Sequence, residues 1–172
     1  MTFNPSSFRE RKAIELVLYV AKRLRHPTLH SVFKLLYFSD KLHLEKYGRL
    51  ILNDGYVAMK HGPVPSDLYN MLKSCRSAEE GKYKDVLQFK DTYNIIPQRE
   101  ANLDFISKSE IECLDNAITK YGKMSFKQLS ELSHDAAWKS ADVNDFISIE
   151  DIAATLPNSK DLLEHLRNPH GD

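Results

Sequence analysis

The sequence predicts an α+β fold, mostly helical, in a single domain of residues 1–172, with a small antiparallel sheet or hairpin inserted between helix groups. Apolar residues recur at intervals of three and four near both ends of the chain, which is the period of a helix with one buried face. Short runs rich in β-forming residues stand between these helical stretches. A chain of 172 residues is long enough for one domain with its own core and short for two.

Two helical patterns occupy the first 50 residues. Ser6 or Ser7 is expected to cap the first helix, and Pro27 stops it because proline cannot continue the hydrogen-bond ladder. Thr28 is expected to cap the second helix, and Gly48 suits its left-handed C-terminal position. The second helix carries a wide apolar stripe, which is typical of a central helix packed on more than one side.

The middle of the chain predicts short extended pieces around one helix. The extended pieces are residues 56–59, a hairpin of residues 84–90 with 92–98, and residues 102–107. The segment HGPVPSDLY (residues 61–69) is interpreted as a rigid turn that leads into a helix capped by Ser66, with Asp67 in its first turn.

The remainder is predicted to be helical, with short helices over residues 148–167 at the end. Ser107 or Ser109, Ser125 and Ser148 are expected to start helices, Asp135 is expected to cap a short turn that contains Trp138, and a last helix is expected over residues 159–167.

Composition argues against several classes of function. Lys plus Arg and Asp plus Glu both number 24, so the chain has no overall basic excess for a nucleic acid, and no nucleic-acid partner is expected. Cys75 and Cys113 lack C-x-x-C spacing, which argues against a disulfide framework or a zinc site and favours the cytoplasm. No apolar run reaches the roughly 18 residues of a membrane span, and the polar start does not resemble a signal peptide.

No set of residues predicts catalysis, a metal or a cofactor, so the protein is expected not to be an enzyme. The seven histidines do not combine into a ligand set, and no serine sits in a G-x-S-x-G turn. Asp40 lies on an otherwise apolar helix face and is therefore expected to be buried as a structural pin. Its expected partners are His61, a nearby lysine, or backbone N–H groups of the loop around Gly62.

Two blocks of sequence resemble the signature of the Panacea domain, also called SocA-like. The first runs from KLLYFSD (residues 34–40) through the Tyr47-Gly48 pair to DGYVAMKHGPVPSDLY (residues 54–69), and the second is LSELSHDAAW (residues 129–138). The resemblance covers roughly residues 10 to 140. The residues that carry it, for which it implies a structural role, are Lys34, Leu35, Leu36, Tyr37, Phe38, Asp40, Gly48, Gly62, Pro63, Val64, Tyr69, His134 and Trp138.

This resemblance implies an antitoxin from a bacterial or phage toxin–antitoxin pair, a setting that includes phage defence. Members of the family chiefly neutralise a cognate protein toxin by direct contact, so a hetero-oligomer with the toxin is expected. Some members instead act as proteolytic adaptors that deliver the toxin to a protease.

Two further hypotheses come from other classes of function. One is an uncharacterised hydrolase that uses Asp40, His61 and His134. The other is a DNA-binding autorepressor, for which phosphate contacts would produce a steep salt dependence.

The partner-binding residues are predicted among positions expected to be exposed, and for Tyr69 a place in the core is the equal alternative. Tyr47 and Arg49 stand at the end of the second helix, and Tyr69 and Met71 stand on the helix that follows the proline-rich segment. Aromatic side chains, Met and Arg are enriched in protein interfaces, which makes these four residues candidate contacts with a toxin.

Overall fold

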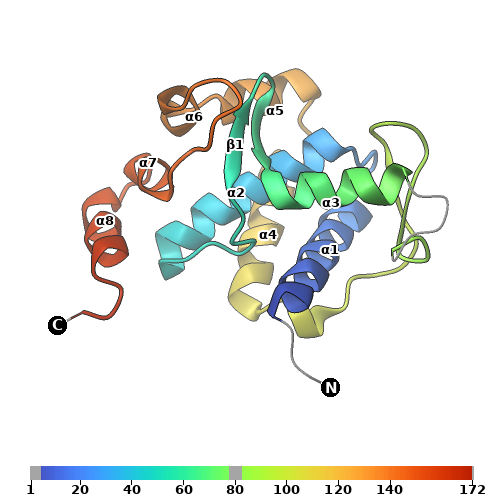
Figure 1. Cartoon of the computed structure of the whole chain (residues 1–172), viewed down its shortest axis with the longest axis horizontal. Helices are drawn as coiled ribbons and strands as arrows, with labels where there is room; N and C mark the ends of the chain where they lie inside the picture. The colour runs from blue at the N-terminus through green and yellow to red at the C-terminus, as the bar shows by residue number, and fades with distance from the viewer. Residues whose placement is uncertain (1–4, 78–82, 172) are drawn as a thin grey trace.

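Helices make up most of the computed structural model, which describes residues 5–77 and 83–171 (Figure 1). In chain order the helices of this part are α1 (Pro5–Arg23), α2 (Leu29–Tyr47), α3 (Ser66–Ser77), α4 (Lys108–Tyr121), α5 (Phe126–Ser133), α6 (Ala136–Ser140), α7 (Ile149–Ala154) and α8 (Ser159–Arg167). Two antiparallel pairs of strands accompany them, β1 (Tyr56–Met59) with β2 (Gly62–Pro65) and β3 (Leu87–Phe89) with β4 (Ile95–Pro97). The predicted class, α+β and mostly helical, is confirmed.

Helix α2 lies at the centre of the molecule and takes part in two apolar clusters (Figure 1). The larger cluster joins α2 to α1, α3, α4 and the β3–β4 hairpin. The smaller cluster joins Tyr37 and Leu44 of α2 to β1, α6, α7 and α8. Since α2 buries side chains on several sides, the interpretation of its wide apolar stripe is confirmed.

Most of the predicted helix caps are present. The side chains of Thr28, Ser107, Ser125, Asp135 and Ser148 each accept a hydrogen bond from a backbone N–H in the first turn of the helix that follows. Gly48 ends α2 in the left-handed region with φ 72°, as predicted. These caps are local, so the sequence alone specifies them.

Two helix starts differ from the prediction. Helix α1 begins at Pro5, ahead of Ser6 and Ser7, whose side chains lie outside the described residues. Proline is well suited to the first helical position because its missing N–H has no partner there. Ser66 is the first residue of α3, and the N–H groups of this helix are capped instead by Asp54, which arrives from the preceding loop.

The segment predicted to be a rigid turn contains a strand. Gly62–Pro65 form β2, which pairs antiparallel with β1 and leaves only Lys60 and His61 at the turn between them. The two prolines of β2 are compatible with pairing because β2 is an edge strand, whose other side forms no strand pair within the described residues. The prediction of a rigid turn is therefore wrong for Gly62–Pro65, because this strand depends on its partner β1 across the turn.

The second hairpin is confirmed, but the extended piece after it is not. Strands β3 and β4 pair Leu87 with Pro97 and Phe89 with Ile95. Residues 103–105, expected to be extended, form a 3₁₀ turn instead. The Asn102 side chain accepts a hydrogen bond from the Asp104 N–H at 3.0 Å, a local bond that favours the turn.

Candidate functional site

Lys34 of α2 fastens the β1–β2 hairpin to the centre of the molecule. Its side chain is 1% exposed, and its Nζ donates a hydrogen bond of 2.9 Å to the Pro63 carbonyl oxygen. Burial lowers the pKa of Lys34 to about 7. No carboxylate pairs with Lys34 in the described parts of the chain, so this cation lies buried with only a neutral acceptor.

Gly62 allows the β1–β2 hairpin to lie close to Lys34 of α2. Its φ of 116° is strongly unfavourable for any residue with a side chain. A Cβ atom at this position would lie 2.2 Å from Ser133 Oγ and 2.5 Å from Lys34 Cε. The hairpin, α2 and α5 therefore meet at a point where only glycine fits.

The second family block attaches α6 to the same hairpin. Trp138 Nε1 donates a hydrogen bond of 2.9 Å to the Met59 carbonyl oxygen, and the Trp138 ring stacks on His134 with centroids 3.9 Å apart. Asp135 accepts hydrogen bonds from Tyr37 Oη and Lys41 Nζ of α2, both at 2.8 Å. The two blocks thus meet in space across the β1–β2 hairpin.

Asp40 is buried as predicted, but its expected partners were wrong. Its carboxylate accepts hydrogen bonds from the Ile51 and Leu52 N–H groups and from Tyr56 Oη, at 2.6, 3.2 and 2.5 Å. Burial raises the pKa of Asp40 to about 6, although these donors favour the anion. Asp40 therefore holds the loop after α2, whereas Lys34 holds the loop around Gly62.

The three residues of the hydrolase hypothesis do not form a common site. Asp40 is 1% exposed, and its oxygens bond to residues 51, 52 and 56. His61 is exposed at the hairpin turn with its ring against Phe126, whereas His134 stacks on Trp138. The two histidines interact electrostatically with each other, but no contact joins either one to Asp40 in the described residues.

The four predicted partner-binding residues lie in three places. Tyr47 and Arg49 both reach α4, where Tyr47 Oη bonds to Glu112 and Arg49 Nη1 bonds to Glu110, each at 2.9 Å. Tyr69 and Met71 are half-buried on α3. They line different hollows, because Met71 faces a groove beside α1 and Tyr69 faces a groove beside α2 and the hairpin.

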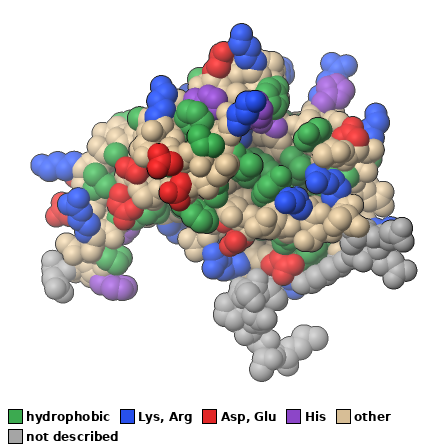
Figure 2. Space-filling view, turned by 45° about the horizontal axis from the view of Figure 1, so that its top comes forward, with side chains coloured by type: hydrophobic (Ala, Val, Ile, Leu, Met, Phe, Trp, Pro, Cys, Tyr) green, Lys and Arg blue, Asp and Glu red, His purple; other side chains and the backbone are tan. Residues whose placement is uncertain are grey.

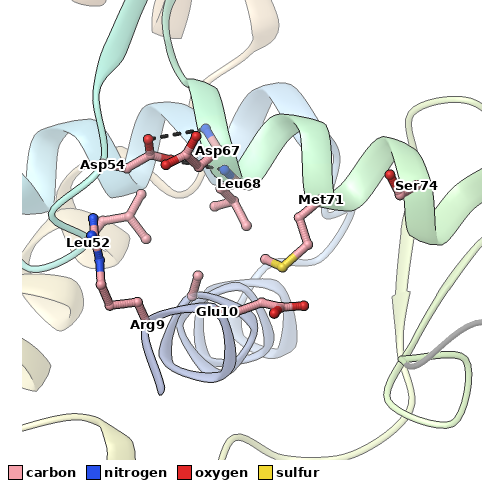
Figure 3. Close-up of a pocket in the computed structure, with 9 residues that line it drawn as sticks. Arg9, Glu10, Leu52, Asp54, Asp67, Leu68, Met71 and Ser74 are labelled. Carbon is pink, nitrogen blue, oxygen red and sulfur yellow. Dashed lines mark hydrogen bonds between the residues drawn. The ribbon is translucent and has the colours of Figure 1, made fainter. Parts of the chain in front are cut away.

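The groove beside α1, which we call the acidic groove, has a volume of about 430 Å³ (Figure 3). Its apolar floor comprises Ala13, Leu52, Leu68 and Met71, and its polar lining comprises Arg9, Glu10, Asp54, Asp67 and Ser74. Asp54 accepts the Asp67 and Leu68 N–H groups, drawn as dashed lines in Figure 3, at 3.1 and 2.9 Å. Glu10 accepts a hydrogen bond of 2.9 Å from Tyr83 Oη, and Arg9 donates to the Asn53 carbonyl oxygen at 2.6 Å.

The groove on the other side of α3, which we call the basic groove, has a volume of about 310 Å³. Its lining includes five basic side chains, His30, Lys34, Lys60, His61 and Arg76, and four aromatic ones, Phe33, Tyr69, Tyr93 and Phe126. No acidic residue is among the described residues that line it. Figure 2 shows a hydrophobic area in the middle of one face, bordered above by Lys, Arg and His side chains and below by Lys and Arg.

Sequence reasoning did not single out Arg76, Tyr93 or Phe126 as neighbours of one groove. They come from α3, the loop between β3 and β4, and α5, and no short motif links these elements. The sequence shows only that each is an aromatic or Arg side chain near the end of a helix or strand, as Tyr47 and Arg49 are.

The described residues contain neither a candidate metal site nor a candidate membrane-spanning helix. They include no group of three or more His, Cys, Asp or Glu side chains placed to hold a metal ion. Residues 5–77 and 83–171 also include no helix with the length and apolar character needed to cross a membrane.

These features define a class, a small α+β domain in which two signature blocks meet at the β1–β2 hairpin and a charged groove lies on each side of α3. The chain belongs to the family of SocA-like antitoxins with a Panacea domain, because the model of that family matches residues 32–139, more than half of the chain. The match includes both blocks and leaves α1 outside. We found no match among curated proteins or among solved structures.

Proposed function

We propose that this protein is a cytoplasmic antitoxin that neutralises a cognate protein toxin by direct protein–protein contact. Membership of the SocA-like Panacea family is the observation that carries the proposal, since the family supports an antitoxin role and implies a toxin partner. It also suggests a role other than catalysis.

The contacts of the signature residues support a structural role for them. Lys34, Asp40 and Trp138 each use their polar atoms on other parts of the same chain. Contacts with the toxin would then fall to the exposed residues around this framework, for which Tyr47, Arg49, Tyr69 and Met71 remain candidates.

The proposal is tested by co-expression with the neighbouring reading frame, which would encode the toxin. Growth arrest caused by the neighbour alone should be relieved by this chain, and the two proteins should co-purify at a fixed ratio. A stable complex of this kind buries on the order of 1,600 Å² in total. Failure of both rescue and co-purification would reject the antitoxin role.

The rescue experiment also separates occlusion from two other mechanisms. If the toxin disappears during rescue and persists in a protease-deficient strain, the protein is an adaptor that delivers the toxin to a protease. If the toxin stays intact, unbound and active while its product is removed, the hydrolase hypothesis replaces the antitoxin proposal.

A further inference from the structure

The basic groove carries positive charge that no carboxylate of residues 5–77 and 83–171 neutralises. Lys34 donates to the Pro63 carbonyl oxygen, and Arg76 Nη1 donates to the Thr92 carbonyl oxygen at 2.7 Å, so both cations contact neutral acceptors. Lys60 is exposed at the hairpin turn and forms no ion pair within the described residues. A partner that brings carboxylates to this groove would therefore form ion pairs without breaking existing ones.

The basic groove also contains the imidazole ring of His30. His30 Nε2 lies 3.0 Å from Ser130 Oγ, and its ring stacks on Phe126 with centroids 3.9 Å apart. Burial, followed by the charge of Lys34, lowers the pKa of His30 to about 4. His30 is thus a neutral hydrogen-bonding group at neutral pH, and the cations of the groove are Lys60, Arg76 and, as the pH falls below about 7, Lys34.

The rim of the groove is aromatic and open to solvent. Tyr93 is 66% exposed and Phe126 is 53% exposed, and both line the groove beside half-buried Tyr69. Exposed aromatic side chains next to an arginine are the composition found at the centre of protein interfaces. Such a rim extends the contact area beyond the hollow itself. A small anion bound in the hollow would leave these aromatic side chains without a contact.

We propose that the basic groove is the docking site for an acidic segment of the toxin, one that carries an aromatic or aliphatic side chain between carboxylates. This inference rests on the proposed antitoxin function and names the surface through which that function would operate. The apolar side chain would enter the hollow against Val64 and Tyr69, and the carboxylates would lie against Lys60 and Arg76.

The test is a charge reversal at Lys60, whose side chain holds no hydrogen bond or ion pair of the fold in the described parts. The toxin encoded by the neighbouring reading frame, made by cell-free synthesis, is titrated with wild-type protein, Lys60→Glu, Lys60→Arg and the control Lys123→Glu. Lys123 is also an exposed lysine in a turn, but it does not line the groove. The control therefore matches the change in net charge.

The docking site predicts that Lys60→Glu weakens toxin binding roughly tenfold or more, because it places like charges opposite one another. Lys60→Arg and Lys123→Glu should bind within about threefold of wild type, since neither alters the charge of the groove. Raising the salt concentration from roughly 0.05 to 0.5 M should weaken wild-type binding more than Lys60→Glu binding. Unchanged melting temperatures would show that the variants are folded.

Three outcomes overturn the inference. If the toxin binds wild type and Lys60→Glu equally well, the antitoxin function stands and the docking site is wrong. If toxin binding is unaffected while ATP, inorganic phosphate or a short single-stranded oligonucleotide raises the melting temperature of wild type but not of Lys60→Glu, the groove binds phosphate-bearing ligands instead. Absence of any binding to wild type would instead reject the antitoxin proposal, and with it the docking site.

Discussion

The two grooves that flank α3 carry opposite charge, and they differ in what that charge already contacts. In the acidic groove Asp54 caps α3 and Glu10 accepts from Tyr83, so these carboxylates are engaged within the chain. In the basic groove Lys34 and Arg76 contact backbone carbonyls, and none of the described carboxylates faces them. The sign of a patch is therefore less informative than whether its charges already have partners.

The grooves also differ in how they relate to the family match. Lys34, Gly62, Val64 and Tyr69 line the basic groove and belong to the signature, inside the matched residues 32–139. The acidic groove takes Arg9, Glu10 and Ala13 from α1, which lies outside that match. The first signature block thus contributes residues to both grooves, and the acidic groove depends in addition on a helix outside the match.

The largest expected effect is at the floor of the basic groove. Gly62→Ala should lower the free energy of unfolding by about 2–6 kcal/mol, combining backbone strain at a φ of 116° with overpacking against Ser133 and Lys34. Chemical denaturation measures the loss. Gly171→Ala, at a glycine with no atom within 4 Å of the added Cβ, is the control for an added methyl group. A loss below about 1 kcal/mol at Gly62 would mean that the groove floor can relax.

The buried cation of the basic groove gives a prediction about pH. Burial lowers the pKa of Lys34 from its ordinary value of 10.5 to about 7, so between these values the unfolded chain binds a proton that the folded chain does not. Stability attributable to Lys34 is then present at high pH and lost as pH falls through 7. The difference in free energy of unfolding between wild type and Lys34→Met should rise by about 1.4 kcal/mol per pH unit within that window.

Urea denaturation near the two ends of that window measures this difference, with the exposed Lys123→Met as the baseline for removing a lysine. A difference that stays constant with pH would show that Lys34 remains charged when folded. The basic groove would then already stabilise its buried cation, and the contrast with the acidic groove would weaken.

Asp40 holds Leu52, which lines the acidic groove, through the Leu52 N–H group. Asp40→Ala leaves the Ile51 and Leu52 N–H groups and Tyr56 Oη without their acceptor, which should cost about 1–3 kcal/mol. Tyr56→Phe removes one of these bonds and should cost less, and the double variant should lose less than the sum of the two. Full stability of Asp40→Ala combined with loss of toxin binding would instead make Asp40 a contact residue.

The sequence predicted what depends on neighbours in the chain and missed what depends on distant ones. The caps at Thr28 and Ser107 need only the following turn, so they could be predicted. The burial of Asp40 followed from the helix period, but its partners depend on how the loop after α2 closes. The groove itself joins positions such as His30 and Phe126, whose rings stack although they lie far apart in the chain and share no local pattern.

The smallest expected effect compares two neighbouring carboxylates of the acidic groove. Asp54 accepts two N–H groups of the first turn of α3, so Asp54→Ala should cost about 0.5–2 kcal/mol, the usual loss of a helix cap. Asp67 is exposed in the same turn, and its side chain forms no hydrogen bond in the described parts, so Asp67→Ala should cost only about 0.5 kcal/mol through the helix dipole.

Because both changes remove one negative charge from one groove, their difference isolates the capping bonds. Thermal denaturation of the two variants at the same pH and salt concentration measures that difference. Equal losses would mean that Asp54 is not engaged by α3. The acidic groove would then have two carboxylates without hydrogen bonds of their own, Asp54 and Asp67. The difference in partnering between the two grooves could then no longer explain why the toxin should prefer the basic one.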